Sequence, residues 1–488
     1  MKLLPGLAAL LATATLAVPV LAEGGYYSGT LGARAAGRGG AFAAKADDLA
    51  AVSFNPAGLA KLDSNLLIQV GNESSYNAYA YTRASTIDYG HPQNGLNPVA
   101  FDKVKNGKPW QPVVPMIGAA SKLGLQNWGF ALAAYAPPGI SKEEFPLGGG
   151  QRYMMLGREA IILKYVGSVA WKYGDVFGVG ATAEWIHVPR LNYSLVIDGS
   201  VFAQANNPVS SDLDMLATTK GSSLFTFNAI LGAWYRPRPF LEFGVSGQVV
   251  PASVVTHSTL DVAPLGSAVS SVGLTRGGTT ANDVTLTLPL PLLARAGGRY
   301  RHLVGNRETY DIELDVDYVT WSRVRRFTIE TNGLEANVPG QAPVPIKRID
   351  IEKHWRDTIA VKLGGDYAAI PDRLTLRAGG YYETAVADPA YANVDFPGGP
   401  QIGGGVGASV FIRRLELVIA YQLRVQPGVS VSETNASVYQ QVPGSPCLTD
   451  VTTCDPNLQG RPSPAINAGT YSASSHLLSL NVLYRYGM

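Results

Sequence analysis

Few residues of this chain have the types and spacing that nucleophilic or metal chemistry requires. Its six histidines are scattered, and neither a His-Glu-x-x-His nor a Cys-x-x-Cys motif occurs. Ser474 and Ser475 precede His476, but a hydrolase also needs a group that orients the base, and none is marked there. No P-loop is present either. The sequence therefore predicts no enzyme, no catalytic metal and no bound cofactor.

Two cysteines, Cys447 and Cys454, lie close together in a polar segment. Without a nearby histidine they cannot complete a tetrahedral metal site, whereas in an exported chain they favour a local disulfide. Export is predicted by residues 1–22, where Lys2 precedes an apolar stretch that ends in small residues. The alternative, a helical membrane anchor, would need a longer span. We therefore predict a cleaved signal peptide and a Cys447–Cys454 disulfide.

Composition narrows the class of protein. Charged residues make up only 16% of the 488 residues, and 39 basic residues balance 37 acidic ones, so no cationic field for nucleic acid exists. The 46% of hydrophobic residues excludes a long disordered chain. After residue 22 there are no apolar runs of about 20 residues, which a polytopic helical membrane protein needs. A chain with 54 glycines and 24 tyrosines instead indicates β-structure with two different faces.

From about residue 64 onward, polar and apolar residues alternate with the period of two that marks β-strands. In the clearest segment, Tyr310 to Tyr318, one face is apolar and the other carries four consecutive acids. A water-soluble core does not need that pattern a dozen times. Fourteen such segments are predicted, near 64–81, 113–121, 127–136, 157–172, 176–194, 223–236, 239–257, 284–301, 308–329, 355–368, 373–386, 401–413, 415–426 and 474–486.

The connections between these segments alternate between long and short. Gly-, Pro- and Ser-rich stretches such as 195–222 and 330–354 are long, whereas Tyr173-Gly174-Asp175 and Pro371-Asp372 are tight turns. Outer-membrane barrels have this asymmetry, which a soluble β-sandwich or propeller does not require. We therefore expect an all-β fold, a 14-stranded antiparallel transmembrane β-barrel over residues 64–488. Aromatic residues near strand ends predict interfacial girdles, namely Trp128, Trp171, Tyr173, Trp234, Tyr235, Trp321 and Trp355.

The polar faces of these strands would line the lumen. Three arginines on one predicted strand are adjacent to four acids on the next, and neighbouring strands lie about 4.8 Å apart. The residues are Arg295, Arg299 and Arg301, and Asp311, Glu313, Asp315 and Asp317. This charge ladder is either a selectivity ring for a hydrophilic solute or structural pairing inside the wall, and we favour the second interpretation.

Residues 23–63 do not alternate, and small side chains dominate them. About forty such residues cannot build a core alone, so in front of a barrel they are best explained as a plug, or hatch, folded inside it. Asp47 and Asp48 are suited to start a short helix at 49–52, which Asn55-Pro56 would end. We expect charged residues of the segment, Arg34, Arg38, Asp47 and Asp48, to attach it to the barrel wall.

The sequence resembles the long-chain fatty acid and hydrocarbon transporters of Gram-negative outer membranes. The carrying motif runs from Gly32 to Ala41 and continues with Ala46-Asp47-Asp48 and Asn55-Pro56-Ala57-Gly58-Leu59. Downstream, Tyr135-Ala136-Pro137-Pro138-Gly139 and Lys353-His354-Trp355-Arg356-Asp357-Thr358 extend the similarity. The resemblance thus covers essentially the whole chain after residue 22.

The resemblance implies passive uptake of fatty acids or aromatic hydrocarbons by a monomeric barrel. Asn55, Pro56 and Ala57 would be the hatch element that moves. An inward kink in the third predicted strand, which runs from Trp128 to Ala136 and includes the lateral-opening residues Trp128, Gly129 and Phe130, would open the wall sideways. Release into hydrocarbon is favourable at about 25 cal/mol per Å² of apolar surface. Implied partners are outer-membrane lipid, lipopolysaccharide and the barrel-assembly machinery. A general diffusion porin is the alternative function, although a porin would not need a forty-residue plug.

A fatty acid carboxylate needs a cation in an otherwise apolar pocket. Lys353 occupies the position of the Lys-His motif that resembles a carboxylate-contacting lysine of the family. Arg190 and Arg158, at the outer ends of the fifth and fourth predicted strands, are further candidates. For each of the three, the competing interpretation is a solvated charge at the barrel rim.

Overall fold

The computed structural model describes residues 30–87, 98–137, 142–198, 214–266, 270–337, 343–346, 348–439 and 465–487. The predicted signal peptide lies outside the described residues, and so do Cys447 and Cys454 with their predicted disulfide. None of the helices in the described ranges is long and apolar enough to cross a membrane.

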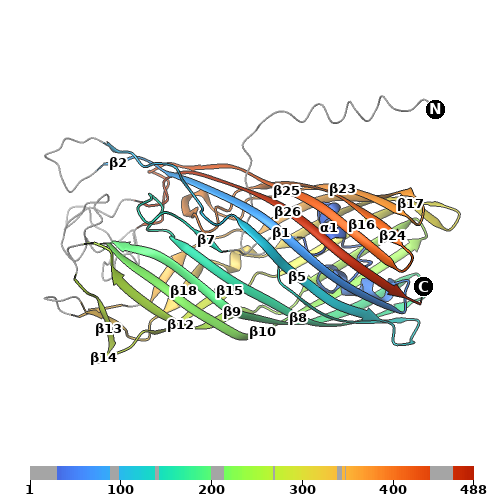
Figure 1. The fold of residues 1–488 in the computed structure, drawn as a ribbon, viewed down its shortest axis with the longest axis horizontal. Coiled ribbons are helices and arrows are strands. Elements are labelled where there is room, and N and C mark those ends of the chain that lie inside the picture. Colours follow the sequence, from blue (N-terminus) through green and yellow to red (C-terminus); the bar gives the residue numbers. More distant parts are fainter. Residues whose placement is uncertain are drawn as a thin grey trace.

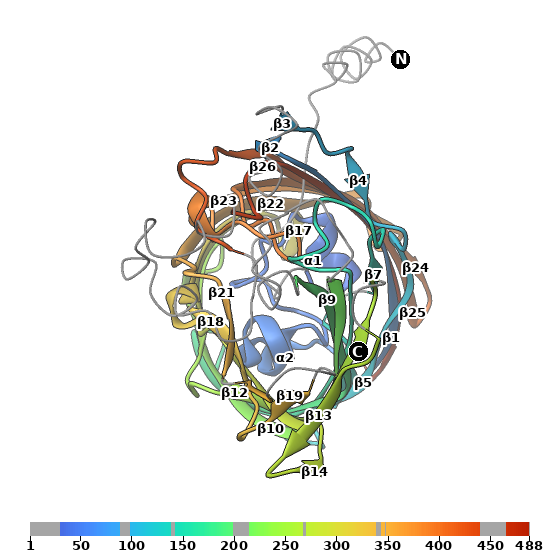
Figure 2. The same cartoon turned by 90° about the vertical axis from the view of Figure 1, so that its left-hand side faces the viewer.

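One antiparallel sheet of twenty strand segments closes on itself as a barrel (Figures 1 and 2). Closure occurs at β1 (Leu66–Arg83), which pairs with β26 (Gly469–Tyr486) on one side and with β5 (Trp110–Ser121) on the other. Four positions in the ring consist of two segments in line, and the short segments β4 (Val104–Lys105) and β7 (Glu143–Glu144) only extend the ladders along β1 and β8 (Gly157–Tyr173). The twenty segments therefore make fourteen strands, as predicted. Closure pairs the first and last strands with each other, so neither end of the sheet is left as a free edge in lipid.

The other single-segment strands are β6 (Trp128–Tyr135), β8 (Gly157–Tyr173), β9 (Phe177–Asp198), β10 (Asp214–Arg238), β23 (Leu374–Glu383), β24 (Gln401–Ile412) and β25 (Leu415–Val431). The two-segment positions are β11 (Leu241–Gln248) with β12 (Ser253–Pro264), β16 (Leu293–Val304) with β15 (Asp283–Pro289), β17 (Arg307–Val319) with β18 (Arg326–Glu330), and β22 (Thr358–Ile370) with β21 (Ile349–Glu352). Short elements among the long connections are β2 (Thr86–Ile87), β3 (Pro98–Val99), β4 (Val104–Lys105), β7 (Glu143–Glu144), β13 (Gly273–Arg276), β14 (Thr279–Thr280), β19 (Glu335–Asn337), β20 (Val344–Pro345), η4 (Trp321–Arg323) and η5 (Pro389–Tyr391).

The strands are apolar outside and polar inside, the reverse of a soluble protein. On β17 the outward residues Ile312 and Leu314 are 51% and 52% exposed, whereas the inward Asp311 and Glu313 are 2% and 0% exposed. The same alternation recurs on β22, β25 and β26. Because apolar side chains gain nothing from facing water, this surface indicates a lipid environment, which confirms the predicted period-two pattern and its inversion.

The strands are longer than predicted on the side with the long connections. In the predicted loop 195–222 the described residues are strand, since β9 continues to Asp198 and β10 begins at Asp214. The predicted loop 330–354 likewise contains β21. These strand extensions lie beyond the apolar band of the barrel, where neither face of a strand needs to be apolar. The alternation of polar and apolar residues that identified the other strands is therefore weak there.

Three of the seven predicted girdle aromatics point into the barrel. Trp234, Trp321 and Trp355 are 2%, 1% and 3% exposed, whereas Tyr173 and Tyr235 are 63% and 51% exposed. Proximity to a strand end was therefore an insufficient criterion. On β10 the alternating direction of side chains turns Trp234 inward, whereas Trp321 lies in η4 and Trp355 in the irregular segment before β22. The girdle prediction is wrong for these three tryptophans.

Residues 30–63, called the hatch below, lie inside the barrel (Figure 2, blue). The hatch comprises α1 (Ala33–Gly37), α2 (Ala51–Phe54) and η1 (Pro56–Lys61). It lies toward the end of the barrel that carries the C-terminus (Figure 1). Apolar hatch residues pack with inward residues of β1, β5, β6, β8, β25 and β26. Elsewhere two further apolar clusters occupy the lumen.

Candidate functional site

Acids of β17 hold the hatch through its backbone. Asp315 Oδ2 accepts hydrogen bonds from the N–H groups of Phe42 and Ala43, at 2.7 and 2.8 Å. Glu313 Oε1 accepts one from the N–H of Ala44 at 2.6 Å. These carboxyl oxygens satisfy backbone N–H groups that would otherwise be buried without an acceptor. The acidic face that the sequence showed on this strand is thus a docking surface for the hatch.

Arg38 of the hatch reinforces that attachment. Its Nη1 lies 2.6 Å from Asp311 and 2.7 Å from Asp366, and its Nη2 lies 2.8 Å from Glu313. The Arg38 side chain is fully buried. A guanidinium matches several carboxylates at once because it presents five donors in a fixed plane.

The predicted charge ladder exists, and its register is Arg295 opposite Asp317, Arg299 opposite Glu313 and Arg301 opposite Asp311. Asp317 binds Arg295 at 3.2 Å, and Arg299 binds Asp311 diagonally at 2.7 Å. Because Asp311, Glu313 and Asp315 also bind the hatch, most of the ladder fits the interpretation as structural pairing inside the barrel.

Inward-facing glycines allow the hatch backbone to touch the wall. A Cβ on Gly232 would lie 2.2 Å from Asn55 Oδ1, and a Cβ on Gly379 would lie 2.0 Å from the Arg38 carbonyl oxygen. Several of these glycines are partners across neighbouring strands, as Gly364, Gly379 and Gly405 are. Glycines whose Cβ would come within 2.5 Å of a hatch atom are Gly129, Gly180, Gly232, Gly244, Gly364, Gly379 and Gly405. We call them the glycine belt.

The Asn55-Pro56-Ala57 element is fixed at the centre of the hatch. Asn55 is fully buried, and its Nδ2 donates to the carbonyl oxygens of Ala43 and Ala233, at 2.9 and 3.0 Å. Its Oδ1 accepts from the Ala57 N–H at 3.2 Å, which caps η1. Trp234 Nε1 donates to the Ala57 carbonyl oxygen at 3.0 Å. The element therefore connects the hatch to β10 through both side chain and backbone.

Asp48 is a poorly satisfied acid within the hatch. Its Oδ1 accepts from the Ala50 N–H at 2.9 Å, but its Oδ2 is buried without a hydrogen-bond partner. Burial raises the pKa of Asp48 to about 6, the neighbouring Asp47 carboxylate contributes to the rise, and Arg34 opposes it. Asp47 differs because it binds Arg34 at 2.7 Å, which outweighs burial and holds its pKa below the usual range.

Replacing Asp48 with asparagine is expected to stabilise the docked hatch at neutral pH. Because the pKa of Asp48 is raised in the folded state, its protonated carboxyl contributes stability to the docked hatch. This stability is fully present below about pH 4 and is lost as the pH rises through about 6. The loss is on the order of 1–3 kcal/mol. The measurement is the urea concentration at which a protease cleaves the hatch, at pH 4.5 and 7.5. Asp48→Asn should remove the difference between the two pH values, and Asp47→Asn, which breaks the Arg34 pair, should lower both midpoints.

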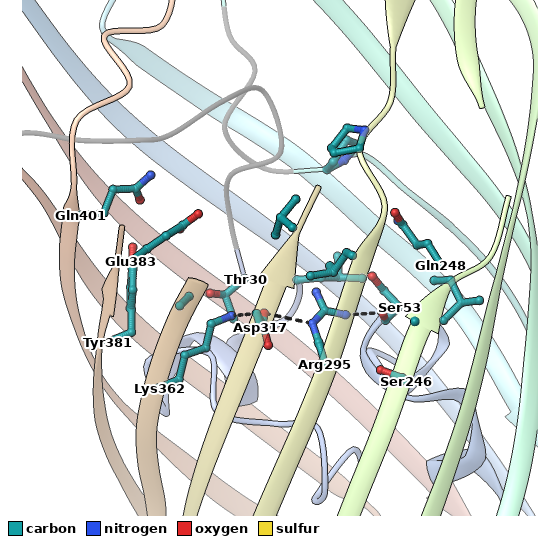
Figure 3. A pocket seen from close by; sticks show the side chains of 18 of the residues that line it. Thr30, Ser53, Ser246, Gln248, Arg295, Asp317, Lys362, Tyr381, Glu383 and Gln401 are labelled. Carbon is teal, nitrogen blue, oxygen red and sulfur yellow. Dashed lines mark hydrogen bonds and ion pairs between the residues drawn. The ribbon is translucent and has the colours of Figure 1, made fainter. Parts of the chain in front are cut away.

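A cavity of about 140 Å³ lies in the lumen beside the hatch. One side is polar: Lys362 Nζ and Arg295 Nε bind Asp317, and Arg295 Nη1 donates to the Ser53 carbonyl oxygen at 2.7 Å (Figure 3). Other lining residues are Thr30, Leu31, Ile230, Gln248, Pro291, Leu293, Val319, Trp321, Tyr381, Glu383, Gln401 and Arg424. Polar hatch-side groups and apolar groups thus meet in one cavity.

The cavity reaches a break in the barrel wall. The ladder of β6 ends at Tyr135, which faces Met116 of β5 and Lys164 of β8, and Pro137 follows without an N–H. Both Tyr135 and Pro137 line the cavity. Toward its outer end, β8 pairs with β7, and in the described part of the chain no ladder partner faces residues 159–163 on that side. Unpaired backbone at membrane depth is tolerated where it lines a cavity.

The predicted lateral-opening residues are not at this break. Trp128 pairs with Trp171 in an intact ladder, and Phe130 pairs with both Ser121 and Val169. Gly129 belongs to the glycine belt and faces Leu59 of the hatch. The structure therefore places these three residues at the opposite end of β6.

Two of the three predicted cations come together. Arg158 Cζ lies 4.0 Å, and Lys353 Nζ 6.0 Å, from the centre of the Phe396 ring. Each is bound to an acid: Arg158 Nη2 to Glu143 at 2.8 Å and Lys353 Nζ to Asp395 at 2.5 Å. Arg158 Nε and Nη1 are buried and have no hydrogen-bond partner. These two cations are buried in the lumen and are not solvated rim charges.

Arg190 lies apart from this pair. Its side chain is 54% exposed and binds Glu159 at 2.9 Å. Arg190 therefore has the geometry of a solvated charge at the barrel rim, which was the competing interpretation for this residue.

Glu143 and Asp395 were missed by sequence reasoning. No local signal marks them, because Glu143 lies in the two-residue β7 and Asp395 in an irregular segment, 15 and 42 residues from their partners. The glycine belt does have a signal, since Gly364 and Gly379 each occur in a Gly-Gly pair inside a strand. His476 points outward, 2.7 Å from the Tyr421 hydroxyl, while Ser475 is buried inside. Among the described residues, no group of three His, Cys, Asp or Glu side chains is arranged to hold a metal ion.

Comparisons with known proteins agree with this architecture. The sequence model of a family described as outer membrane protein transport protein (OMPP1/FadL/TodX) matches residues 10–485. No curated protein sequence matches the chain. Among solved structures, a Pseudomonas aeruginosa FadL homologue has 17% identity and a TM-score of 0.69, with 96% of this chain and 100% of that chain covered.

Two toluene transporters are also similar in structure. The Pseudomonas putida toluene transporter TodX has 13% identity and a TM-score of 0.60, with 95% of this chain and 100% of that chain covered. The Ralstonia pickettii toluene transporter TbuX has 14% identity and a TM-score of 0.58, with 94% and 98% covered. At these identities the likenesses show the fold.

Proposed function

Since the chain belongs to the family of outer membrane transport proteins described as OMPP1/FadL/TodX, we propose that it takes up hydrophobic compounds by passive transport through its lumen. The protein is a β-barrel of the outer membrane. The proposed cargo is a long-chain fatty acid or a hydrocarbon, and the observation that carries the proposal is a lumen that joins apolar clusters to buried cations.

Apolar surface in the lumen supports a hydrophobic cargo. One buried cluster includes Leu286, Trp321 and Trp355, and another includes Tyr79 and Tyr471. A hydrophilic solute gains nothing from such surfaces, whereas burial of apolar cargo is favourable at about 25 cal/mol per Å². The toluene transporters with this fold are named for a hydrophobic compound as well.

Arg158 and Lys353 are the proposed site for a carboxylate head group. The Nε and Nη1 nitrogens of the Arg158 guanidinium are buried and unsatisfied, and a ligand carboxylate would accept a hydrogen bond from one of them. The Phe396 ring beside both cations offers apolar contact for the adjacent methylenes. Lys353 would take part by exchanging Asp395 for the ligand.

Release is proposed to occur sideways at the wall break after Tyr135, instead of at Trp128–Phe130. The cavity meets the break there, and hydrocarbon lies outside it. The movement of Asn55, Pro56 and Ala57 in the hatch remains the proposed gating step. Interaction with lipopolysaccharide, assembly by the barrel machinery and the monomeric state remain predictions of the resemblance.

A general diffusion porin is the competing function, and the hatch argues against it. A porin lumen is a water-filled channel, whereas here a segment docked by Arg38 and the acids of β17 occupies the lumen. The charge ladder that would have served as a selectivity ring is engaged with that segment.

Altering the Asn55 element tests the proposal. Asn55→Ala leaves the carbonyl oxygens of Ala43 and Ala233 without their donor, at about 1–3 kcal/mol for each buried group. Because the adjacent Ser53 carbonyl holds Arg295 at the cavity, we expect labelled oleate or toluene uptake by cells to fall about tenfold. The matched control is Asn282→Ala. The Asn282 amide is exposed and donates a hydrogen bond to Asp261, and it lies away from the hatch.

Mass spectrometry of the purified barrel completes the experiment by identifying bound lipid. Uptake of either compound that depends on Asn55 but not on Asn282 would support hydrophobic transport and identify the cargo class. A barrel without bound lipid, without uptake and with large ion conductance in planar bilayers would be a porin.

A further inference from the structure

Arg83 is a buried cation that the transport route described above does not use. It is the last residue of β1 and is 3% exposed. Its Nη1 and Nη2 are both buried without a hydrogen-bond partner, and in the described part of the chain no carboxylate pairs with it. Arginine stays protonated in proteins, and an unpaired buried charge costs several kcal/mol. A bound anion would stabilise a guanidinium in this environment.

The neighbouring polar groups are directed elsewhere. Asp214 is taken by Arg152, whose Nε lies 3.0 Å from it, and by the Tyr153 hydroxyl at 3.0 Å. The Tyr81 hydroxyl donates to the Ala468 carbonyl oxygen at 2.7 Å. Within the described ranges, the positive charge of Arg83 is therefore left without an anionic partner.

Arg83 faces the lumen beside an apolar cluster. On β1 it shares the inward face with Tyr79 and Tyr81, both of which belong to the cluster that also contains Leu156 and Val394. Leu156 and Val394 directly precede Gly157 and Asp395 in the chain, so the cluster extends from Arg83 to the Arg158–Lys353 pair. Four residues of strand separate Arg83 from Tyr79, a distance of about 13 Å.

The Phe101 ring covers one face of the guanidinium. The Arg83 Cζ lies 4.8 Å from the centre of the Phe101 ring, and that ring is partly exposed. Phe101 lies in the irregular segment between β3 and β4. A ligand would reach Arg83 by displacing one aromatic side chain.

We propose that Arg83 is an entry site for the carboxylate of a hydrophobic acid, which binds there before it reaches Arg158 and Lys353. The two free Nη groups form the end of the fork that binds a carboxylate with two hydrogen bonds. The apolar cluster accommodates the chain of the acid. This inference rests on the proposed function and adds to it a preference for hydrophobic acids over neutral hydrocarbons at entry.

The first experiment compares uptake of oleate and toluene by cells that carry the full-length protein. Arg83→Met should lower the initial rate of oleate uptake at subsaturating concentration about ten- to hundredfold, because hydrogen bonds to a charged group are lost. Toluene uptake should change less than twofold. Arg83→Lys, which keeps the charge but loses the fork, should be intermediate, and Arg190→Met at the exposed rim should leave both rates unchanged.

A local probe reports on the site itself. Phe101→Trp in the purified barrel places an indole over the guanidinium, and its emission should change with oleate but not with oleyl alcohol or inorganic phosphate. The double variant Phe101→Trp, Arg83→Met should lose the response. A response to phosphate that depends on Arg83 would instead indicate a site for lipid phosphate and overturn the proposal.

The outcomes separate the two levels of inference. If the wild type takes up neither compound, the proposed function itself fails. If the wild type takes up both and Arg83→Met slows them equally or not at all, only the entry site is wrong. Heat-modifiable migration on gels verifies that each variant forms a barrel.

Discussion

Replacing Arg38 with methionine is expected to open the barrel to ions. The substitution leaves the carboxylates of Asp311, Glu313 and Asp366 buried with one cation fewer. Removal of one partner from a buried ion pair costs about 3–5 kcal/mol, so the balance between docked and released hatch should shift by roughly 10²–10⁴-fold. Planar-bilayer recordings should then show large conductance steps that the wild type lacks.

Arg301→Met is the matched control for Arg38→Met. Arg301 is also an arginine of the lumen, but it binds Glu308 at 2.6 Å and the Pro239 carbonyl oxygen, not the hatch. Its substitution should leave the barrel closed. Equal conductance of Arg38→Met and wild type, in barrels that migrate as folded, would mean that Arg38 does not hold the hatch in place.

Gly379→Val is expected to displace the hatch, with a smaller adjustment at the Leu363 carbonyl oxygen of β22, which would lie 2.8 Å from the new Cβ. The new Cβ would lie 2.0 Å from the Arg38 carbonyl oxygen and 2.3 Å from its carbon, and real Cβ atoms essentially never approach backbone so closely. Overpacking typically costs about 1–3 kcal/mol, and more where the obstacle is backbone. Valine itself suits a strand. Trypsin should therefore cleave the hatch at Arg34, Arg38 or Lys45, which are protected in the wild type by burial.

The control for this clash is Gly298→Val. Gly298 faces outward, and its Cβ would meet only the Phe243 ring at 3.5 Å, an ordinary contact. Cleavage in both variants, or in neither, would refute the role that we assign to the glycine belt.

The strand pattern could be predicted from the sequence because lipid and lumen impose opposite demands on alternate residues. Each strand carries that signal locally, as Ile312 and Glu313 illustrate, so the strand number, the barrel and the inward acids of β17 follow without tertiary information. Beyond the apolar band, as in β10 from Asp214 to Ser222, lipid no longer requires alternate residues to be apolar. The predicted strand boundaries were wrong there.

The hatch was predictable in outline for a similar reason. Its small residues cannot build a core alone, and its charges need partners, so a position inside the barrel is the simplest solution. The partners were not predictable. Arg38 binds Asp311, which is 273 residues away, and no local pattern encodes that separation.

The candidate site depended almost entirely on tertiary structure. Lys353 and Arg158 could be singled out by type, but closure of the barrel decided that both meet the Phe396 ring and are neutralised by Asp395 and Glu143. Side-chain direction placed Trp234 against the hatch instead of in a girdle. Thus the sequence by itself determined a lipid-facing barrel with an internal plug, since each residue's preference for lipid or lumen is local. Tertiary structure alone decided which charges are paired and which, like Arg83, are left for a ligand, because pairing depends on distances between strands far apart in the chain.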